Sequence, residues 1–286
     1  MLSFIDNLNE WQFYLFLIVS FAVLGFISRG VVAVKWTRPE FMSRIANFAF
    51  LKLSLFYSGL FFFALPLVKS WYGTQGFPQV PREFWDGMPL LLTAFLLLLM
   101  YDFTLYWAHR FLHHPLLWPS HAVHHSDEHM NFLTWSRGHP AEQIVIVMAL
   151  LFSSTWMGIK IEEIAGLALL RSLHQYYVHE NLDWDHGPFH YVLVSPRYHR
   201  WHHVDHPDAW DKNFASIFPF LDKMFGTYYN PHPSVDMPTG IGEHTPGNNV
   251  IALSTWPFIE WASMIAGKFK SEKQKRSLMA AKVTKD

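Results

Sequence analysis

The stretch MPLLLTAFLLLLMYDFTLYWA, residues 88–108, leads directly into HRFLH, residues 109–113. It is apolar along most of its length, and about 20 such residues are needed to cross a hydrocarbon core. Residues 11–34 and 48–68 have the same character and a similar length. We therefore predict three membrane-spanning helices in the first 108 residues, the third of which ends at a pair of histidines.

The composition of the 286-residue chain also indicates a membrane protein, because 51% of its residues are hydrophobic and only 16% are charged. A soluble domain carries about 25% charged residues. Cysteine is absent, which excludes disulfides, thiolate metal sites and iron–sulfur clusters, so any metal must be bound through nitrogen or oxygen. The net charge is −1 and the basic residues concentrate in residues 29–52 and 268–285, so nucleic acid is not an expected partner.

A fourth apolar region comprises residues 143–159 and 161–177, interrupted by Gly158 and by three charged residues that follow it. This pattern predicts a helical hairpin that enters and leaves the membrane on one side. With its flanks, the hairpin is expected at residues 142–181.

The basic residues predict the orientation of the chain. The second connection, residues 70–87, has one arginine offset by two acids, whereas the first connection is strongly basic. The positive-inside rule places the first connection in the cytoplasm, so the chain from His109 onward emerges on the cytoplasmic side. The basic residues around the first connection are Arg29, Lys35, Arg38, Arg44 and Lys52.

We therefore expect an all-α integral membrane protein with about three transmembrane helices, a helical hairpin and a cytosol-facing, histidine-rich helical cap. The transmembrane helices occupy residues 1–108, and the histidine-rich catalytic region occupies residues 109–230, including the hairpin. A C-terminal loop and basic tail follow at residues 231–286. We treat these parts as a single domain, because no stretch has the composition of a domain linker.

Histidines are concentrated in one part of the chain, since 16 of the 18 fall between His109 and His206. His109 and His113 form an i,i+4 pair, which shares one face of a helix. The runs HAVHH, residues 121–125, and HRWHH, residues 199–203, repeat a spacing whose i, i+3 and i+4 positions project together on a helix. Such groups of imidazoles can converge on a metal ion.

His174 and His179 lie between these runs. Their i,i+5 spacing puts the two rings about 140° apart on a regular helix, so at most one fits the same site easily, and His179 is favoured. Eight histidines from the three main motifs, with one or two from this segment, exceed what one ion can bind while keeping a position open. The sequence therefore predicts two metal ions, and imidazole suits iron, zinc, copper and nickel alike.

A single histidine at a membrane interface is usually an amphipathic surface residue or a core residue with a backbone hydrogen bond. This interpretation is the better one for His232 and His244. For six further histidines, a role as a surface or core residue is at least as good an interpretation as metal binding. These are His114, His129, His139, His186, His190 and His206.

Asp102 lies seven residues before His109, on the same helical face and inside an apolar span, where a charge is costly unless it is paired or functional. A ligating imidazole commonly donates its second N–H to a carboxylate, so we expect Asp102 to serve catalysis by orienting a histidine. The alternative is a carboxylate paired for packing alone. Asn131 and Asn181 are expected to orient water or a histidine, and weaker acidic candidates are Asp127, Glu128, Asp183, Asp205 and Asp211.

The order HxxxH, HxxHH and HxxHH behind hydrophobic spans resembles the fatty acid hydroxylase and sterol desaturase superfamily. Flanking residues extend the resemblance, which covers roughly residues 102–227. It implies a helical membrane protein with a cytosol-facing di-iron centre. The resemblance also implies that the cofactors are two iron ions, as Fe2+ or Fe3+, and that O2 is a co-substrate. The ligands it implies are His109, His113, His121, His124, His125, His179, His199, His202 and His203, and His174 is a tenth candidate.

The resemblance also implies an oxidoreductase that oxidises a C–H bond of a lipid-like substrate, such as a fatty acyl chain or a sterol. Hydroxylation, desaturation, methyl oxidation and ether cleavage share this metal chemistry, and the motifs do not separate them. The sequence contains no GxGxxG or CxxC motif, so the electrons are expected from a separate ferredoxin, cytochrome or reductase.

A metal or proton transporter with a histidine-lined path is the main alternative. It predicts histidines at several depths along the spans, but the first two predicted spans contain none. A zinc hydrolase is expected to carry HExxH, which does not occur. A structural or receptor-type membrane protein has no need for so many coordinated histidines.

Overall fold

The computed structural model describes residues 37–159, 161–231, 237–242 and 246–267. All regular elements within these residues are helices, and the one extended pairing is an isolated antiparallel bridge between Val204 and Thr239. The prediction of an all-α fold is therefore confirmed for this part of the chain. The first predicted span, the basic tail and two single histidines, His232 and His244, lie outside the described residues.

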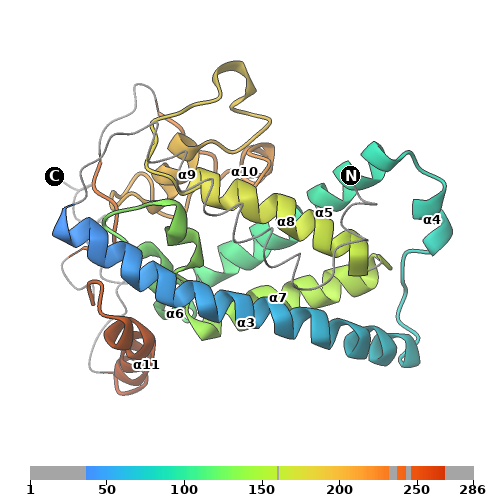
Figure 1. Ribbon diagram of the computed structural model, residues 1–286, viewed down its shortest axis with the longest axis horizontal. Coiled ribbons are helices and arrows are strands. Elements are labelled where there is room, and N and C mark those ends of the chain that lie inside the picture. The colour runs from blue at the N-terminus through green and yellow to red at the C-terminus, as the bar shows by residue number, and fades with distance from the viewer. Residues whose placement is uncertain (1–36, 160, 232–236, 243–245, 268–286) are drawn as a thin grey trace.

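Four long helices run along the long axis of the molecule (Figure 1). They are α3 (Arg38–Thr74), α5 (Leu90–Leu112), α7 (Pro140–Trp156) and α8 (Ile161–Val178). Helices α3 and α5 both pack on α7. The apolar core between them is formed by Phe61, Leu65, Trp85, Leu97, Tyr101, Leu151, Met157 and Ile159.

Helix α5 is, within the described residues, the one helix that is long and apolar enough to cross a membrane. It contains most of the third predicted span and extends it to Leu112. The second predicted span, residues 48–68, lies inside α3 and stays a prediction. Two shorter apolar helices are α7 and α11 (Val250–Ile265).

The region of the predicted hairpin contains two helices, α7 and α8, and its placement in a membrane stays a prediction. The connection between α3 and α5 includes α4 (Arg82–Asp86) and hydrogen-bonds to the C-terminal end of α7. The Val80 N–H donates to the Trp156 carbonyl at 2.9 Å, and the Trp85 indole N–H donates to the Met157 carbonyl at 2.7 Å. This end of α7 lies at the end of the molecule opposite the short helices α6 and α9 (Figure 1).

Gly158 makes the tight turn of the hairpin possible. Its φ is +64°, and a Cβ added there would lie 2.6 Å from the Val80 carbonyl oxygen. A left-handed conformation is costly for other residues, so we expect Gly158→Ala to lower the free energy of unfolding by about 1–3 kcal/mol, measured by thermal unfolding in detergent. Gly59→Ala is the control, because nothing lies within 4 Å of its added Cβ inside α3. Equal stability of the two variants would contradict this account.

Short helices gather at the other end of the molecule, around the histidine motifs (Figure 1). Local capping explains why they begin where they do. The Ser195 hydroxyl accepts the Tyr198 N–H at 3.2 Å, and Pro196 occupies the first helical turn, where a missing N–H costs nothing. These elements are α6 (Trp118–His125), η1 (Phe132–Ser136), η2 (Gly187–Phe189), α9 (Pro196–His203) and α10 (Phe220–Met224).

Candidate metal centre

Nine of the ten predicted histidine ligands lie together in two groups, each of which could hold a metal ion. Within each group, ring nitrogens from all members lie within 4.8 Å of one another. Group 1 comprises His109, His113, His121, His125 and His202, and group 2 comprises His124, His179, His199 and His203.

Helical geometry explains how each HxxHH motif serves both groups. A residue four positions on lies about 40° to one side of position i, whereas a residue three positions on lies about 60° to the other side. Accordingly, α6 gives His121 and His125 to group 1 and His124 to group 2. Helix α9 does the reverse, because His199 and His203 join group 2 and His202 joins group 1.

The two groups are adjacent. The ring centroids of His125 in group 1 and His203 in group 2 lie 4.5 Å apart, with the planes nearly stacked. The rings of His125 and His202, which belong to the same group but to different helices, lie 4.6 Å apart. Helices α6 and α9 therefore contribute to one compact centre with two candidate metal positions.

The Nε2 atoms of group 2 converge. His179 Nε2 lies 2.9 Å from His199 Nε2 and 3.3 Å from His124 Nε2. His203 Nε2 lies 3.2 Å from His199 Nε2, and in group 1 the corresponding distance between His121 and His125 is also 3.2 Å. Nitrogen lone pairs that face each other this closely are suited to a shared cation.

Backbone carbonyls fix the opposite ring nitrogen of three of these histidines. His109 Nδ1 donates to the Phe214 carbonyl at 3.0 Å, and His202 Nδ1 donates to the Lys212 carbonyl at 2.7 Å. His179 Nδ1 donates to the carbonyl of Gln175, one turn earlier in α8, at 2.7 Å. Because a carbonyl can only accept, the proton stays on Nδ1 and Nε2 keeps its lone pair for a metal.

Two carboxylates lie close to ring nitrogens of group 1. Asp211 Oδ1 lies 3.0 Å from His113 Nδ1, and Glu142 Oε1 lies 3.3 Å from His121 Nδ1. Asp211 is half exposed, whereas Glu142 is buried. The Asp211 contact is a hydrogen bond of the kind that fixes the orientation of a ligating imidazole, whereas the Glu142 contact is a close approach without hydrogen-bond geometry.

The burial of the histidines favours the neutral form that binds metals. Desolvation by burial, reinforced by neighbouring imidazoles, holds the pKa of His125 and of His203 well below the usual value for histidine. The buried Nε2 atoms of His109 and His202 have no hydrogen-bond partner among the described residues. Buried polar atoms are seldom left without a partner, so this all-nitrogen donor set fits metal ions of the kind that imidazole prefers.

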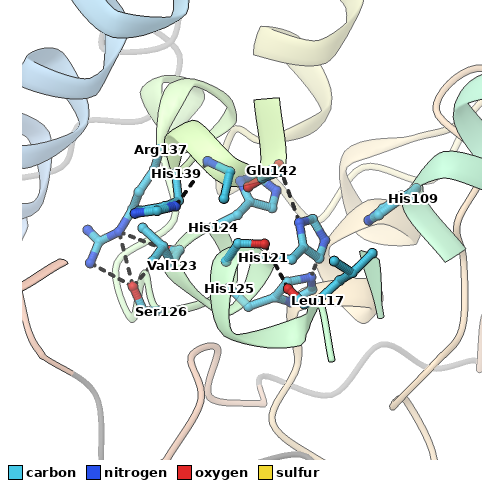
Figure 2. Close-up of polar contacts among 12 residues, drawn as sticks. His109, Leu117, His121, Val123, His124, His125, Ser126, Arg137, His139 and Glu142 are labelled. Atoms are coloured by element: carbon cyan, nitrogen blue, oxygen red, sulfur yellow. Dashed lines mark hydrogen bonds and ion pairs between the residues drawn. The ribbon is translucent and has the colours of Figure 1, made fainter. Parts of the chain in front are cut away.

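Arg137 fixes the end of α6 on the side away from Glu142 (Figure 2). Its Nε donates to the Val123 carbonyl at 3.2 Å, and its Nη2 donates to the Ser126 hydroxyl at 2.9 Å. The side chain is fully buried. Burial raises the pKa of neighbouring Asp127, but the Arg137 charge and hydrogen bonds from three side chains outweigh this and hold that pKa below its usual value.

Asp102 has a different partner from the predicted imidazole. Its carboxylate is fully buried and accepts the backbone N–H groups of Ser216, Ile217 and Phe218 at 2.7–3.1 Å. The segment after Phe214 makes a turn against α5, where its N–H groups need acceptors in the core. Asp102 therefore anchors the segment whose Phe214 carbonyl orients His109, and does not itself contact a histidine of either group.

The other predicted residues also lie outside the two groups. Asn131 caps η1 by accepting the Leu133 N–H at 3.1 Å, and Asn181 Oδ1 accepts from Arg200 Nη1 at 2.7 Å. His174 Nε2 donates to the Val194 carbonyl at 3.1 Å, on a different face of α8 from His179. The i,i+5 spacing accounts for this separation of the two rings.

Glu142 was not predicted from the sequence as a partner of a histidine, and Asp211 was among the weaker acidic candidates. The available signal for Glu142 is a carboxylate in the first turn of an otherwise apolar helix. The carbonyls of Phe214 and Lys212 carry no sequence signal, because every residue has one.

The Glu142→Gln variant is expected to bind metal 10- to 100-fold more weakly, as is typical when a partner of a ligating histidine is lost. The change keeps the shape of the side chain but replaces the carboxyl group that faces His121 Nδ1 with an amide. Metal titration of the purified protein measures the effect. Asp211→Asn is the comparison and should have a smaller effect, since solvent already screens the half-exposed Asp211. An unchanged metal affinity in Glu142→Gln would contradict this role.

A cavity of about 190 Å³ lies between α3, α5, α7 and α8. Its walls are mainly apolar and include Phe61, Phe62, Leu105, Val147 and Leu150. Histidines from both groups also line it, namely His109, His121, His124, His179 and His199. An apolar chain in this cavity would lie against both candidate metal positions.

Comparison with known proteins agrees with this geometry. The fatty acid hydroxylase family model matches residues 94–227. The chain is 35% identical to alkylglycerol monooxygenase from Danio rerio over 142 residues, which are 48% of this chain and 30% of the relative. Ornithine lipid hydroxylase from Rhizobium tropici is 28% identical over 151 residues, with coverages of 52% and 46%. Methylsterol monooxygenase 1 from Rattus norvegicus is 25% identical over 190 residues, with coverages of 64% and 63%.

These alignments span less than two thirds of each relative's own length. No solved structure matches the chain significantly. The matched region begins in α5, ends at Thr227 and contains both histidine groups. Through this region, which is slightly less than half of the chain, the protein resembles the fatty acid hydroxylase family.

Proposed function

We propose that this chain is an O2-dependent di-iron membrane monooxygenase that hydroxylates a C–H bond of a lipid. The observation that carries the proposal is the apolar cavity whose wall includes histidines of both groups. An enzyme that oxidises an unactivated carbon needs such a junction between an apolar binding space and a redox centre. The family match supports the same conclusion.

Two iron ions would be held by the nine histidines, one by group 1 and one by group 2. When bound, iron would pass electrons from the donor to O2 and provide the open coordination positions that O2 activation requires. The nitrogen donors alone suit several metals, and the family match favours iron. His174 is no longer proposed as a ligand, because its Nε2 hydrogen-bonds to the Val194 carbonyl outside both groups.

The protein's own residues prepare the site in two ways. Hydrogen bonds that Nδ1 of His109, His179 and His202 donates to backbone carbonyls hold these rings before metal binds, so little reorganisation is needed. The apolar wall of the cavity, including Phe61 and Leu105, keeps water away from the reacting carbon. Together they favour oxidation of the lipid over side reactions with solvent.

Hydroxylation is the reaction that we favour among those that share this metal centre. The similar proteins are named alkylglycerol monooxygenase, ornithine lipid hydroxylase and methylsterol monooxygenase. Such a reaction inserts one atom of O2 into a C–H bond and releases the other as water, which consumes two electrons and two protons. A separate ferredoxin, cytochrome or reductase would supply the electrons.

The proposal also covers the membrane arrangement. Helix α5 is apolar and long enough to cross a bilayer, and the histidine groups lie at its C-terminal end. We propose a multi-pass protein with about three spans and the metal centre on the cytoplasmic side. The gathering of nine histidines at one place favours an enzyme over the transporter alternative, which needs them spread along a path.

Lipid analysis of a host that expresses the protein tests the proposed function. We expect new hydroxylated lipids that require O2 and that are absent with His124→Ala, a group 2 variant. His190→Ala is the control, because His190 is only partly buried and belongs to neither group. A lipid profile that is the same with and without the His124 substitution would contradict the proposal.

A further inference from the structure

The cavity that reaches the histidine groups also contains an arginine, Arg171 of α8. Arg171, Gln175 and His179 follow one another at intervals of four residues, so they lie along one face of the helix. Arg171 is two turns, about 12 Å of helix rise, before His179. A cationic side chain thus borders the space in which the lipid is proposed to bind, at a set distance from group 2.

The guanidinium of Arg171 makes no hydrogen bond or ion pair with any residue that the structure describes, and its Nε is buried. Its Cζ lies 5.7 Å from the ring centroid of Trp135, a contact that supplies no acceptor. A guanidinium stays charged in proteins and offers five N–H donors. Removing such a group from water without a partner is unfavourable.

Among the described residues, neither nearby acid forms a hydrogen bond or an ion pair with Arg171. Asp102 attracts Arg171 electrostatically, but its carboxylate accepts three backbone N–H groups. Glu142, the acid in the cavity wall, lies against His121 Nδ1. The cavity therefore offers a cation whose donors are available to a ligand.

We propose that Arg171 binds an oxyanion, a carboxylate or a phosphate, at the head of the lipid substrate. The planar fork of a guanidinium matches both groups with two parallel hydrogen bonds. The apolar wall of Phe61, Val147 and Leu150 receives the chain of the same molecule. This inference rests on the proposed function, and it makes Arg171 the residue that selects anionic lipids and sets which carbon faces the histidines.

Binding measurements on the full-length protein in detergent test the proposal without turnover. Octanoate, octyl phosphate and 1-octanol are compared as probes by titration calorimetry, on metal-free and on iron-loaded protein. We expect at least one of the two anions to bind about tenfold more tightly than 1-octanol, as a charge-assisted hydrogen bond predicts. The anion that shows this preference identifies the head group.

The variants separate the arginine from other sources of anion affinity. Arg171→Gln should remove the preference, Arg171→Lys should keep part of it, and Arg110→Gln, at a separate surface pocket, should leave it unchanged. Equal binding of anions and 1-octanol to the wild type would overturn the proposal. So would a preference that survives Arg171→Gln but disappears when iron is removed, because the metal would then be the anion's partner.

If the proposed function were wrong, the protein would lack iron or form no hydroxylated products. The anion preference measured on metal-free protein does not depend on either result. Unfolding temperatures of the three variants show whether each is folded.

Discussion

The His179→Ala variant is expected to lose lipid hydroxylation by more than about 100-fold, which exceeds the usual cost of losing an outer partner of a metal ligand. His179 is the member of group 2 contributed by α8, and its Nε2 lies 2.9 Å from His199 and 3.3 Å from His124. Removing it leaves group 2 with three histidines. Product formation in membranes from the expression host, normalised to the amount of protein, measures the effect.

His174→Ala is the matched control for this prediction. It removes a histidine from the same helix, five residues earlier, whose Nε2 donates to the Val194 carbonyl. We expect its activity to stay within about tenfold of the wild type, because only one neutral hydrogen bond is lost. Comparable losses in the two variants would contradict the assignment of His179, and not His174, to group 2.

Replacement of Arg137 by methionine is expected to lower the free energy of unfolding by about 3–5 kcal/mol, the usual cost of removing one partner from a buried charged network. Arg137 is fully buried. It donates to the Val123 carbonyl, the Ser126 hydroxyl, the Gly247 carbonyl and the Asn248 side chain. These contacts tie the end of α6 to the chain that leads into α11.

Loss of Arg137 also leaves Asp127 buried without its main opposing charge. Thermal unfolding in detergent, followed by circular dichroism, measures the change in stability. Arg82→Met is the control, since its ion pair with Asp86 is largely exposed and such pairs contribute about 1 kcal/mol or less. A decrease in Arg137→Met no larger than that in Arg82→Met would show that the network contributes little to stability.

The sequence predicted the helices and most of the centre because both depend on helical periodicity. The i, i+3, i+4 spacing of the HxxHH motifs is enough to bring His121, His124 and His125 to one region. The sequence kept His174 as a tenth candidate, and the structure places it outside both groups because its i,i+5 spacing from His179 turns the ring away. The two helices predicted for residues 143–159 and 161–177 are present as α7 and α8, since both apolar stretches are as long as helices.

The hydrogen-bond partners of the histidines could not be predicted in the same way, because most of them belong to residues far from the histidines in the sequence. Asp102 is on the face of α5 expected for a partner of His109, yet the turn at residues 216–218 takes both of its oxygens. Backbone carbonyls of Phe214 and Lys212 orient two histidines instead. Only the three-dimensional course of the chain after α9 reveals which acceptors reach the rings.

The iron content of the purified protein tests the central claim most directly. It is measured by elemental analysis and iron spectroscopy on the wild type, His124→Ala and His202→Ala, which probe groups 2 and 1, with His190→Ala as the control. We expect two iron ions per chain in the wild type and in the control, and a loss in both group variants that is larger in His124→Ala, because group 2 has fewer ligands. Stoichiometric zinc without iron after growth in iron-replete medium, or iron that neither group variant loses, would contradict the account.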